Sequence, residues 1–230
     1  MLRKSSQRCD HVIYIKPPSR QLQHERKTPL LNTIEPHIKA IIFDADGTLI
    51  DTMPAHYLAW EETTQFFGGH FPEKLFYELG GIPSRRIVEI LNEKFGHSWN
   101  PEEFTAHKEK LYIDTYLPKC KIIEPVVDIA KLYKGRMPLG VGTGATQEVV
   151  QAALAVTGIS DLFDTVVGAD DVKNGKPAPD TFLEAARRLG VEPQYCLVYE
   201  DSDMGLRAAE SAGMTSIDVR PYLVPAQNGR

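Results

Sequence analysis

Four groups of reactive side chains stand out in the sequence, each lying beyond a short apolar run. They are Asp44, Asp46 and Thr48 in the string Asp-Ala-Asp-Gly-Thr, Thr143 between Gly142 and Gly144, Lys176 before Pro177, and the acids Glu200, Asp201 and Asp203. Open parallel sheets place their sites beyond the carboxyl ends of the strands, so we expect these groups to lie together. Acids, a hydroxyl and an ammonium suit phosphoryl transfer, which needs a cation, donors for the phosphoryl oxygens, a nucleophile and an acid.

The expected cluster of carboxylates needs a cation, because closely packed carboxylates repel and one of them would otherwise stay protonated. Oxygen ligands with no Cys or His-rich set nearby favour Mg²⁺ over zinc. A bound phosphate would find further donors in Thr143, Lys176 and the backbone N–H groups of the turns, with Gly144 among them. A carboxylate can also act as a nucleophile by forming an aspartyl-phosphate. In Asp44-Ala45-Asp46, one side chain can face phosphorus and the other the leaving oxygen.

Each of these motifs has an ordinary structural explanation when it is taken alone. Asp-x-Asp after a strand is common in turns, and a Lys before Pro is usually a solvated loop charge. Thr143, or the pair Glu200-Asp201, could simply cap the helix that follows. A catalytic role is favoured because all of these motifs occur in one sequence and follow successive predicted strands.

Apolar runs and helical spacing alternate along most of the chain. The expected strands are Ile38–Phe43, Met137–Val141, Asp164–Gly168, Tyr195–Tyr199 and Thr215–Val219, and the expected helices are 124–134, 146–157, 179–189 and 203–212. Strands that alternate with helices of this length predict a parallel sheet covered on both faces. Residues 54–118 instead show helical spacing with almost no strand signal, which predicts an inserted helical domain.

The expected fold class is therefore α/β, with a Rossmann-like parallel sheet core and an inserted all-helical cap domain. The core is predicted to comprise residues 37–53 and 119–224, and the cap residues 54–118. Residues 1–36 hold seven Lys or Arg against three Asp or Glu and show no sustained period, so we expect a flexible basic extension. Within this extension, only Val12–Ile15 is predicted to form a short strand. It lacks the apolar core of a secretory signal, while an organelle transit peptide is disfavoured by Asp10 and Glu25 without being excluded.

Composition excludes several classes of protein. A net charge of −5 and a pI near 5.8 argue against a nucleic-acid partner, and no uncharged apolar run approaches the length of a membrane span. The three cysteines, Cys9, Cys120 and Cys196, are scattered and fit a reducing compartment. We therefore expect a cytoplasmic, monomeric protein whose partner is a small molecule rather than a nucleic acid or a membrane.

The motifs together resemble those of the haloacid dehalogenase-like (HAD) phosphohydrolase superfamily. The string Phe43-Asp44-Ala45-Asp46-Gly47-Thr48-Leu49 is similar to its first motif, Thr143 to the second, Lys176 in Lys-Pro-Ala-Pro-Asp to the third, and Glu200-Asp201-Ser202 to the fourth. The resemblance covers residues 36–223. It is strongest to the branch with a helical cap, which contains β-phosphoglucomutase and the fructose-1-phosphate and 6-phosphogluconate phosphatases.

This resemblance implies a role for each matching residue. It implies Asp44 as nucleophile, Asp46 as general acid and base, and Thr143 and Lys176 as ligands of the transferring phosphate. Mg²⁺ would be held by Asp44, the Asp46 carbonyl, Glu200 and Asp201. In the cap, Thr52 corresponds to a hinge and His56 to a histidine that helps to position the acid, although His56 could equally be ordinary helix packing. Arg85 or Arg86 could receive a distal anionic group of the substrate or could line a solvated helix face.

The identity of Asp46 separates the activities of this superfamily. A dehalogenase lacks an acid there because a leaving halide needs no proton, whereas an ester alkoxide does. Gly142-Thr143-Gly144-Ala145 also lacks the hydroxyl-rich Ser-x-Ser segment of the mutases. We therefore expect a Mg²⁺-dependent phosphatase of sugar phosphates such as fructose 1-phosphate or 6-phosphogluconate, with a hexose-phosphate mutase as the alternative and a non-enzymatic phosphoacceptor module as a remote one.

Overall fold

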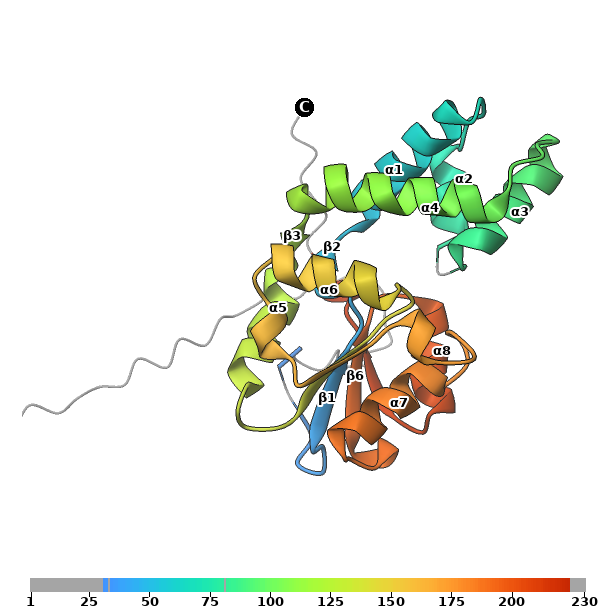
Figure 1. Ribbon diagram of the computed structural model, residues 1–230. Helices are drawn as coiled ribbons and strands as arrows, with labels where there is room; N and C mark the ends of the chain where they lie inside the picture. The colour runs from blue at the N-terminus through green and yellow to red at the C-terminus, as the bar shows by residue number, and fades with distance from the viewer. Residues whose placement is uncertain (1–30, 33, 81, 224–230) are drawn as a thin grey trace, which may run out of the picture.

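A five-stranded parallel sheet forms the core of the protein (Figure 1). The computed structural model describes residues 31–32, 34–80 and 82–223. The strands, in their order across the sheet, are β5 (Thr165–Val167), β4 (Leu139–Gly142), β1 (Ala40–Phe43), β6 (Cys196–Glu200) and β7 (Thr215–Asp218). The α/β fold class is confirmed, and every expected strand is present with its ends shifted by no more than two residues.

Helices cover both faces of this sheet (Figure 1). One face packs against α5 (Glu124–Tyr133) and α6 (Gln147–Val156), and the other against α7 (Asp180–Leu189) and α8 (Asp203–Ser211). Successive side chains of a strand point to opposite faces, so Ile41 and Phe43 join the first cluster while Ala40 and Ile42 join the second. The sheet is thus buried on both sides, and its strand ends are the part left open for chemistry.

A helical cap is inserted between β2 and β3. It consists of α1 (Met53–Phe66), α2 (Glu73–Glu78), α3 (Ser84–Phe95) and α4 (Pro101–Leu111), followed by the π-helical turn η1 (Tyr112–Tyr116) and the short 3₁₀ turn η2 (Leu117–Lys119). The cap has its own apolar cluster, in which Trp60, Phe71 and Phe104 are fully or almost fully buried. The inserted helical cap is therefore confirmed.

Two very short strands connect the cap to the core. β2 (Ile50–Asp51) pairs antiparallel with β3 (Lys121–Ile122), so both passages of the chain between the two parts run side by side (Figure 1). Two residues are too few to show the alternation that identifies a strand in a sequence. From the sequence, only the expected hinge residue Thr52 and the domain boundaries at 53/54 and 118/119 fall at this point.

The expected extension, residues 1–36, lies mostly outside the described residues, and so does the expected strand Val12–Ile15. Of its described part, Leu31 is only 4% exposed and Ile34 packs against the same apolar cluster. The hydroxyl of buried Tyr199 donates a hydrogen bond of 2.7 Å to the Leu31 carbonyl. The packed core thus includes residues that precede the expected core boundary at 37.

No helix in the described ranges combines the length and apolar character that a membrane crossing requires. The exact domain boundaries, the monomeric state and the cytoplasmic location stay predictions.

Candidate active site

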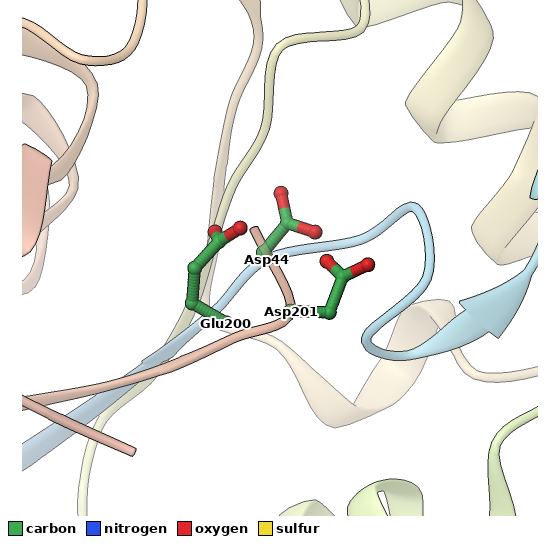
Figure 2. A group of neighbouring side chains, drawn as sticks. All are labelled: Asp44, Glu200 and Asp201. Atoms are coloured by element: carbon green, nitrogen blue, oxygen red, sulfur yellow. The ribbon is translucent and has the colours of Figure 1, made fainter. Parts of the chain in front are cut away.

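Two neighbouring strands in the middle of the sheet bring three carboxylates together. Asp44 follows β1 directly, Glu200 is the last residue of β6, and Asp201 comes next. The strands run in register, with Phe43 paired to Tyr199, and the Asp44 N–H donates to the Tyr199 carbonyl. Figure 2 shows the three carboxyl groups gathered at this edge, and one ligand oxygen from each lies within 4.8 Å of the others.

Lys176 supplies the positive charge of this cluster. Its Nζ lies 2.6 Å from Asp44 Oδ1 and 2.8 Å from Glu200 Oε2, and all three side chains are nearly inaccessible. Burial lowers the pKa of the ammonium, but the charges of Asp44 and Glu200 outweigh it and raise that pKa above its ordinary value. Lys176 is therefore a permanent cation across the neutral pH range.

The carboxylates still repel one another although Lys176 lies beside two of them. Burial, followed by the charge of Glu200, raises the pKa of Asp44 well above its usual range, against the opposing effect of Lys176. Burial and Glu200 raise the pKa of Asp201 to about 7, although a hydrogen bond from Thr48 opposes the shift. A second cation at the cluster would offset the repulsion between the carboxylates and lower their pKa values.

These residues fit a hard divalent ion. The donor set consists of carboxylate oxygens, which suit Mg²⁺ rather than a softer metal. The Asp46 carboxylate contacts Thr52 and His56 instead of this cluster, and a metal contact of its main-chain carbonyl stays a prediction. The structure thus contains an acidic cluster that could hold a divalent cation, and Mg²⁺ as that cation stays a prediction.

Further groups hold the carboxylates in place. The Ser202 N–H and hydroxyl both donate to Glu200 Oε1, at 3.0 and 2.6 Å, and Thr48 Oγ1 donates to Asp201 Oδ1 at 3.1 Å. A Cβ atom at Gly47, which has φ +82°, would overlap the Asp201 carboxylate, and one at Gly205 would overlap that of Glu200. The two glycines therefore allow the backbone to approach the acids closely.

Asp46 is oriented by Thr52, the residue before α1, and by the cap. Its Oδ1 accepts a hydrogen bond of 2.7 Å from Thr52 Oγ1 and lies 3.5 Å from His56 Nε2. Burial raises the pKa of Asp46, but the hydrogen bond and charge of His56, with help from Thr52 and Lys108, bring it below its ordinary value. The expected roles of Thr52 and His56 thus have a geometric basis, because both contact the same carboxylate oxygen.

Lys108 on α4, which was not among the expected site residues, completes this chain of contacts. Its Nζ lies 3.1 Å from His56 Nδ1, so the proton of His56 is assigned to Nε2, facing Asp46. Lys108 is only 4% exposed, and burial lowers its pKa to about 8. A signal did exist in the sequence: Lys108 is four residues from both Phe104 and Tyr112, on the apolar face of its helix.

The expected phosphate ligand Thr143 follows β4 and is 1% exposed. Its Oγ1 accepts a hydrogen bond from the Ala145 N–H at 3.1 Å, while its own N–H donates to the Val167 carbonyl at 3.0 Å. Gly144 next to it is exposed, and a Cβ atom there would meet nothing within 4 Å. The turn therefore leaves open space beside the strand end.

Arg85 and Arg86 are engaged within the cap. Both lie in the first turn of α3 with exposed side chains: Arg85 forms an ion pair with Glu102, and Arg86 with Glu89 and Glu93. No contact joins either of them to the acid cluster in the described structure. The geometry favours the alternative of a solvated helix face over the receptor for a distal anion.

The sequence profile of the "Haloacid dehalogenase-like hydrolase" family matches residues 41–219, which is most of the chain. The protein belongs to this family. The expected resemblance is thereby confirmed, and so is the expected class of enzyme, a phosphoric monoester hydrolase.

Two curated relatives of this family member carry phosphatase names. The fructose-1-phosphate phosphatase YqaB of Escherichia coli is 41% identical over 78% of this chain and 95% of its own length. The phosphorylated carbohydrates phosphatase of Thermotoga maritima is 33% identical over 78% of this chain and 84% of its own length.

Solved structures agree with the fold. A β-phosphoglucomutase from Clostridium difficile superposes with a TM-score of 0.67 at 30% identity, covering 79% of this chain and 84% of its own. CbbY from Rhodobacter sphaeroides, solved in complex with phosphate, gives a TM-score of 0.71 at 26% identity, with 79% and 85% covered.

Proposed function

We propose that this HAD-family hydrolase is a Mg²⁺-dependent sugar-phosphate phosphatase that works through an aspartyl-phosphate on Asp44. The observation that carries the proposal is the separation of two carboxylates with different partners. Asp44 is paired with Lys176 at the acid cluster, while Asp46 is turned toward Thr52 and His56. One carboxylate is thus placed to attack phosphorus and the other to exchange a proton with the leaving group.

In the first half-reaction, Asp44 attacks phosphorus in line with the leaving oxygen. The bond from Asp44 to phosphorus forms as the bond from phosphorus to the sugar oxygen breaks, and Asp46 gives its proton to that oxygen. Lys176 and Thr143 hold the oxygens of the phosphoryl group as it moves. A magnesium ion held by Asp44, Asp201, Glu200 and the Asp46 carbonyl would offset the charge of the phosphoryl group.

In the second half-reaction, Asp46 removes a proton from water, which attacks phosphorus and releases Asp44 with inorganic phosphate. The lowered pKa of Asp46 keeps it ionised in the free protein, as this base role requires. For its acid role Asp46 must carry a proton, and the negative phosphate arriving beside it raises its pKa in that direction. The Nε2–H of His56 holds the carboxylate toward the site in both steps.

The sugar-phosphate class of substrate rests on similarity. The relative in Escherichia coli is named for fructose 1-phosphate and the one in Thermotoga maritima for phosphorylated carbohydrates. We propose fructose 1-phosphate and related phosphorylated sugars as substrates, with 6-phosphogluconate as the other candidate of the sequence analysis.

The proposal is tested by Asp44→Asn, which keeps the size of the side chain and removes its nucleophilic oxygen. We expect phosphate release from fructose 1-phosphate and p-nitrophenyl phosphate to fall to background in the presence of Mg²⁺. Asp203→Asn is the control, because Asp203 is exposed and outside the acid cluster. Retention of more than a few per cent of wild-type turnover by Asp44→Asn would contradict the mechanism.

A mutase remains the second candidate, because the similar structure from Clostridium difficile is a β-phosphoglucomutase. Phosphorus NMR of β-glucose 1-phosphate turnover separates the two activities. A phosphatase yields inorganic phosphate, whereas a mutase yields glucose 6-phosphate.

A further inference from the structure

Two aromatic rings lie against the ammonium group of Lys108. The Lys108 Nζ is 5.6 Å from the centre of the Trp60 ring, on α1, and 5.3 Å from the centre of the Tyr112 ring, at the end of α4. These two helices lie side by side in the cap (Figure 1), and both rings are almost or fully inaccessible to water. A cation is attracted to the negative face of an aromatic ring, and the attraction is stronger where water is excluded. The rings therefore offset part of the cost of burying the Lys108 charge.

Tyr112 also lies against His56. The two rings stack with their centres 3.9 Å apart and their planes 13° apart. Both nitrogen atoms of His56 have a neighbour: Lys108 Nζ lies 3.1 Å from Nδ1, and Asp46 Oδ1 lies 3.5 Å from Nε2. Tyr112 thus contacts both His56 and Lys108, and it fixes the plane in which the imidazole meets its two partners.

Tyr112 reaches this place because of its position in the helix. It lies four residues after Lys108, so the two side chains share one face, and its backbone N–H donates to the Lys108 carbonyl. The chain widens at Tyr112 into the π-helical turn η1, and π-helical turns are frequent at functional sites. The contact with His56 is made by the face of the ring, whereas the Tyr112 hydroxyl lies near the Cys120 thiol.

Lys108 lies where two apolar clusters of the molecule meet. Trp60 belongs to the cluster of the cap, whereas Tyr112 belongs to the cluster that includes Ile41 and Phe43 of β1. An apolar side chain at position 108 would pack between the two rings without the cost of burying a charge. The presence of a buried ammonium at this boundary therefore favours a role in chemistry over a role in packing.

We propose that Tyr112, with Trp60 as the second ring against Lys108, is a positioning residue for proton transfer by Asp46. The inference rests on the proposed phosphatase function, because it assigns Tyr112 to the orientation of the acid of that mechanism. The Tyr112 ring holds the plane of the His56 imidazole, Lys108 occupies Nδ1, and the Nε2–H is thereby directed at Asp46. Removal of the ring face frees the imidazole to turn, and Asp46 then loses a fixed partner.

The test separates the ring of Tyr112 from its hydroxyl group. Tyr112→Phe keeps the aromatic face, and Tyr112→Leu removes it. We expect kcat for fructose 1-phosphate to change by less than about twofold in Tyr112→Phe and to fall about tenfold in Tyr112→Leu, because the orientation of the general acid is impaired while the acid itself remains. Rapid release of nitrophenol from p-nitrophenyl phosphate should be nearly unchanged in both variants, since nitrophenolate leaves without a proton.

Phe76→Leu is the matched control for loosening of the cap. Phe76 is a buried ring of α2 that packs on Tyr57 and Phe71 within the apolar cluster of the cap. We expect this substitution to lower the thermal stability of the protein and to leave the ratio of the two substrates unchanged. Thermal unfolding curves show which variants remain folded.

A series of ring-fluorinated phenylalanines at position 112 tests the same contact without loss of a ring. Each fluorine withdraws electron density from the ring face and weakens its attraction for the Lys108 ammonium, with little change in shape. We expect turnover of fructose 1-phosphate to fall in steps from Tyr112→Phe to the trifluorinated ring, by about fivefold in total. The rapid release of nitrophenol should stay constant across the series.

Nitrogen NMR of the His56 ring gives a readout that does not depend on turnover. We expect the proton on Nε2 in the wild-type protein and in Tyr112→Phe, and a mixture of the two tautomers in Tyr112→Leu. A role of Tyr112 in packing alone would leave the position of this proton unchanged.

Two results overturn the inference on its own. One is an equal loss of rate on both substrates in Tyr112→Leu or across the fluorinated series, and the other is turnover of fructose 1-phosphate that neither change affects. If the wild-type protein releases no phosphate from fructose 1-phosphate or from p-nitrophenyl phosphate with Mg²⁺, the proposed function fails, and the tautomers of His56 still test the contact with Tyr112. The two failures are therefore distinguishable.

Discussion

The two halves of the active site are held in different ways. On the core side, Asp44, Glu200 and Asp201 are fixed by paired strands, and Lys176 bridges two of them at 2.6 and 2.8 Å. On the cap side, Asp46 is oriented by Thr52 at the hinge and by His56 and Lys108 on two cap helices. The acids of the core half are thus held by residues of the core alone, whereas the orientation of Asp46 also depends on α1 and α4 of the cap.

This difference assigns different chemistry to the two halves. In the proposed mechanism, binding and transfer of the phosphoryl group depend on groups that the sheet holds, and they should be possible for any phosphate ester. Proton transfer to the leaving oxygen depends on cap residues, and it matters most for leaving groups that need a proton. Substitutions in the two halves should thus differ in how strongly they depend on the substrate.

After Asp44→Asn, the largest effect common to all substrates is expected for Lys176→Ala on the core side. It removes the cation that contacts Asp44 and Glu200, so kcat should fall by about 10³-fold on every substrate, activated or not. Steady-state phosphate release measures this, with Lys173→Ala as the control because Lys173 is an exposed lysine of the same loop. A loss confined to poor leaving groups would contradict the assignment of Lys176 to the phosphoryl group.

An effect that depends on the substrate is expected for Asp46→Asn. General acid catalysis typically contributes about 10²–10⁴-fold, so turnover of fructose 1-phosphate should fall within that range. Loss on p-nitrophenyl phosphate should be much smaller in the phosphorylation step, because nitrophenolate leaves without a proton. Rapid-mixing kinetics of nitrophenol release measures that step alone. Equal losses of rate on the two substrates would contradict the assignment of Asp46 as the proton donor to the leaving group.

Lys108→Met tests whether Lys108 positions the acid through His56. Burial, and then the charge of Lys108, lowers the pKa of His56, so removal of that charge should raise the pKa. Turnover of fructose 1-phosphate should fall about tenfold, with less effect on p-nitrophenyl phosphate. NMR titration of the His56 ring gives a readout that a merely structural role would not move.

Lys110→Met is the control for that experiment, because Lys110 is an exposed lysine of α4 that pairs with Asp114. This substitution should leave the pKa of His56 unchanged. An unchanged His56 titration in Lys108→Met would show that Lys108 does not act through this histidine.

The smallest effect is expected for Arg86→Ala. This guanidinium is exposed and paired with Glu89 and Glu93, and exposed ion pairs contribute little. Values of kcat/KM for sugar phosphates should change by less than about twofold, as expected for a side chain outside the reacting groups. A tenfold rise in KM would instead indicate that Arg86 contacts the substrate, which is the role that its position at the start of a cap helix suggested.

The core half was predictable from the sequence because parallel strands bring their carboxyl ends to one edge. Asp44, Thr143 and Asp201 each follow a buried strand directly and Glu200 ends one, so the parallel topology brings all four to one edge of the sheet. The contacts of the cap half were harder to predict from the sequence. Lys108 is distant in sequence from His56, and their contact depends on how α1 and α4 pack, which the spacing of apolar residues does not specify.

Two other features show the same limit. The strands β2 and β3 are two residues each, too short for a periodic signal, and they form only because both linkers run side by side. Arg85 follows Pro83 at a helix start, where it could have met a substrate. Its exposed ion pair with Glu102 depends on the angle between α3 and α4.

The central claim is that Asp44 carries the phosphoryl group during turnover. Its most direct test is rapid quenching of the enzyme during turnover of fructose 1-phosphate with Mg²⁺, followed by peptide mass spectrometry. We expect one phosphoryl group on the peptide that contains Asp44, located on that side chain and lost in Asp44→Asn. A phosphoryl group on Asp46 or on any other residue, or none during active turnover, would contradict it.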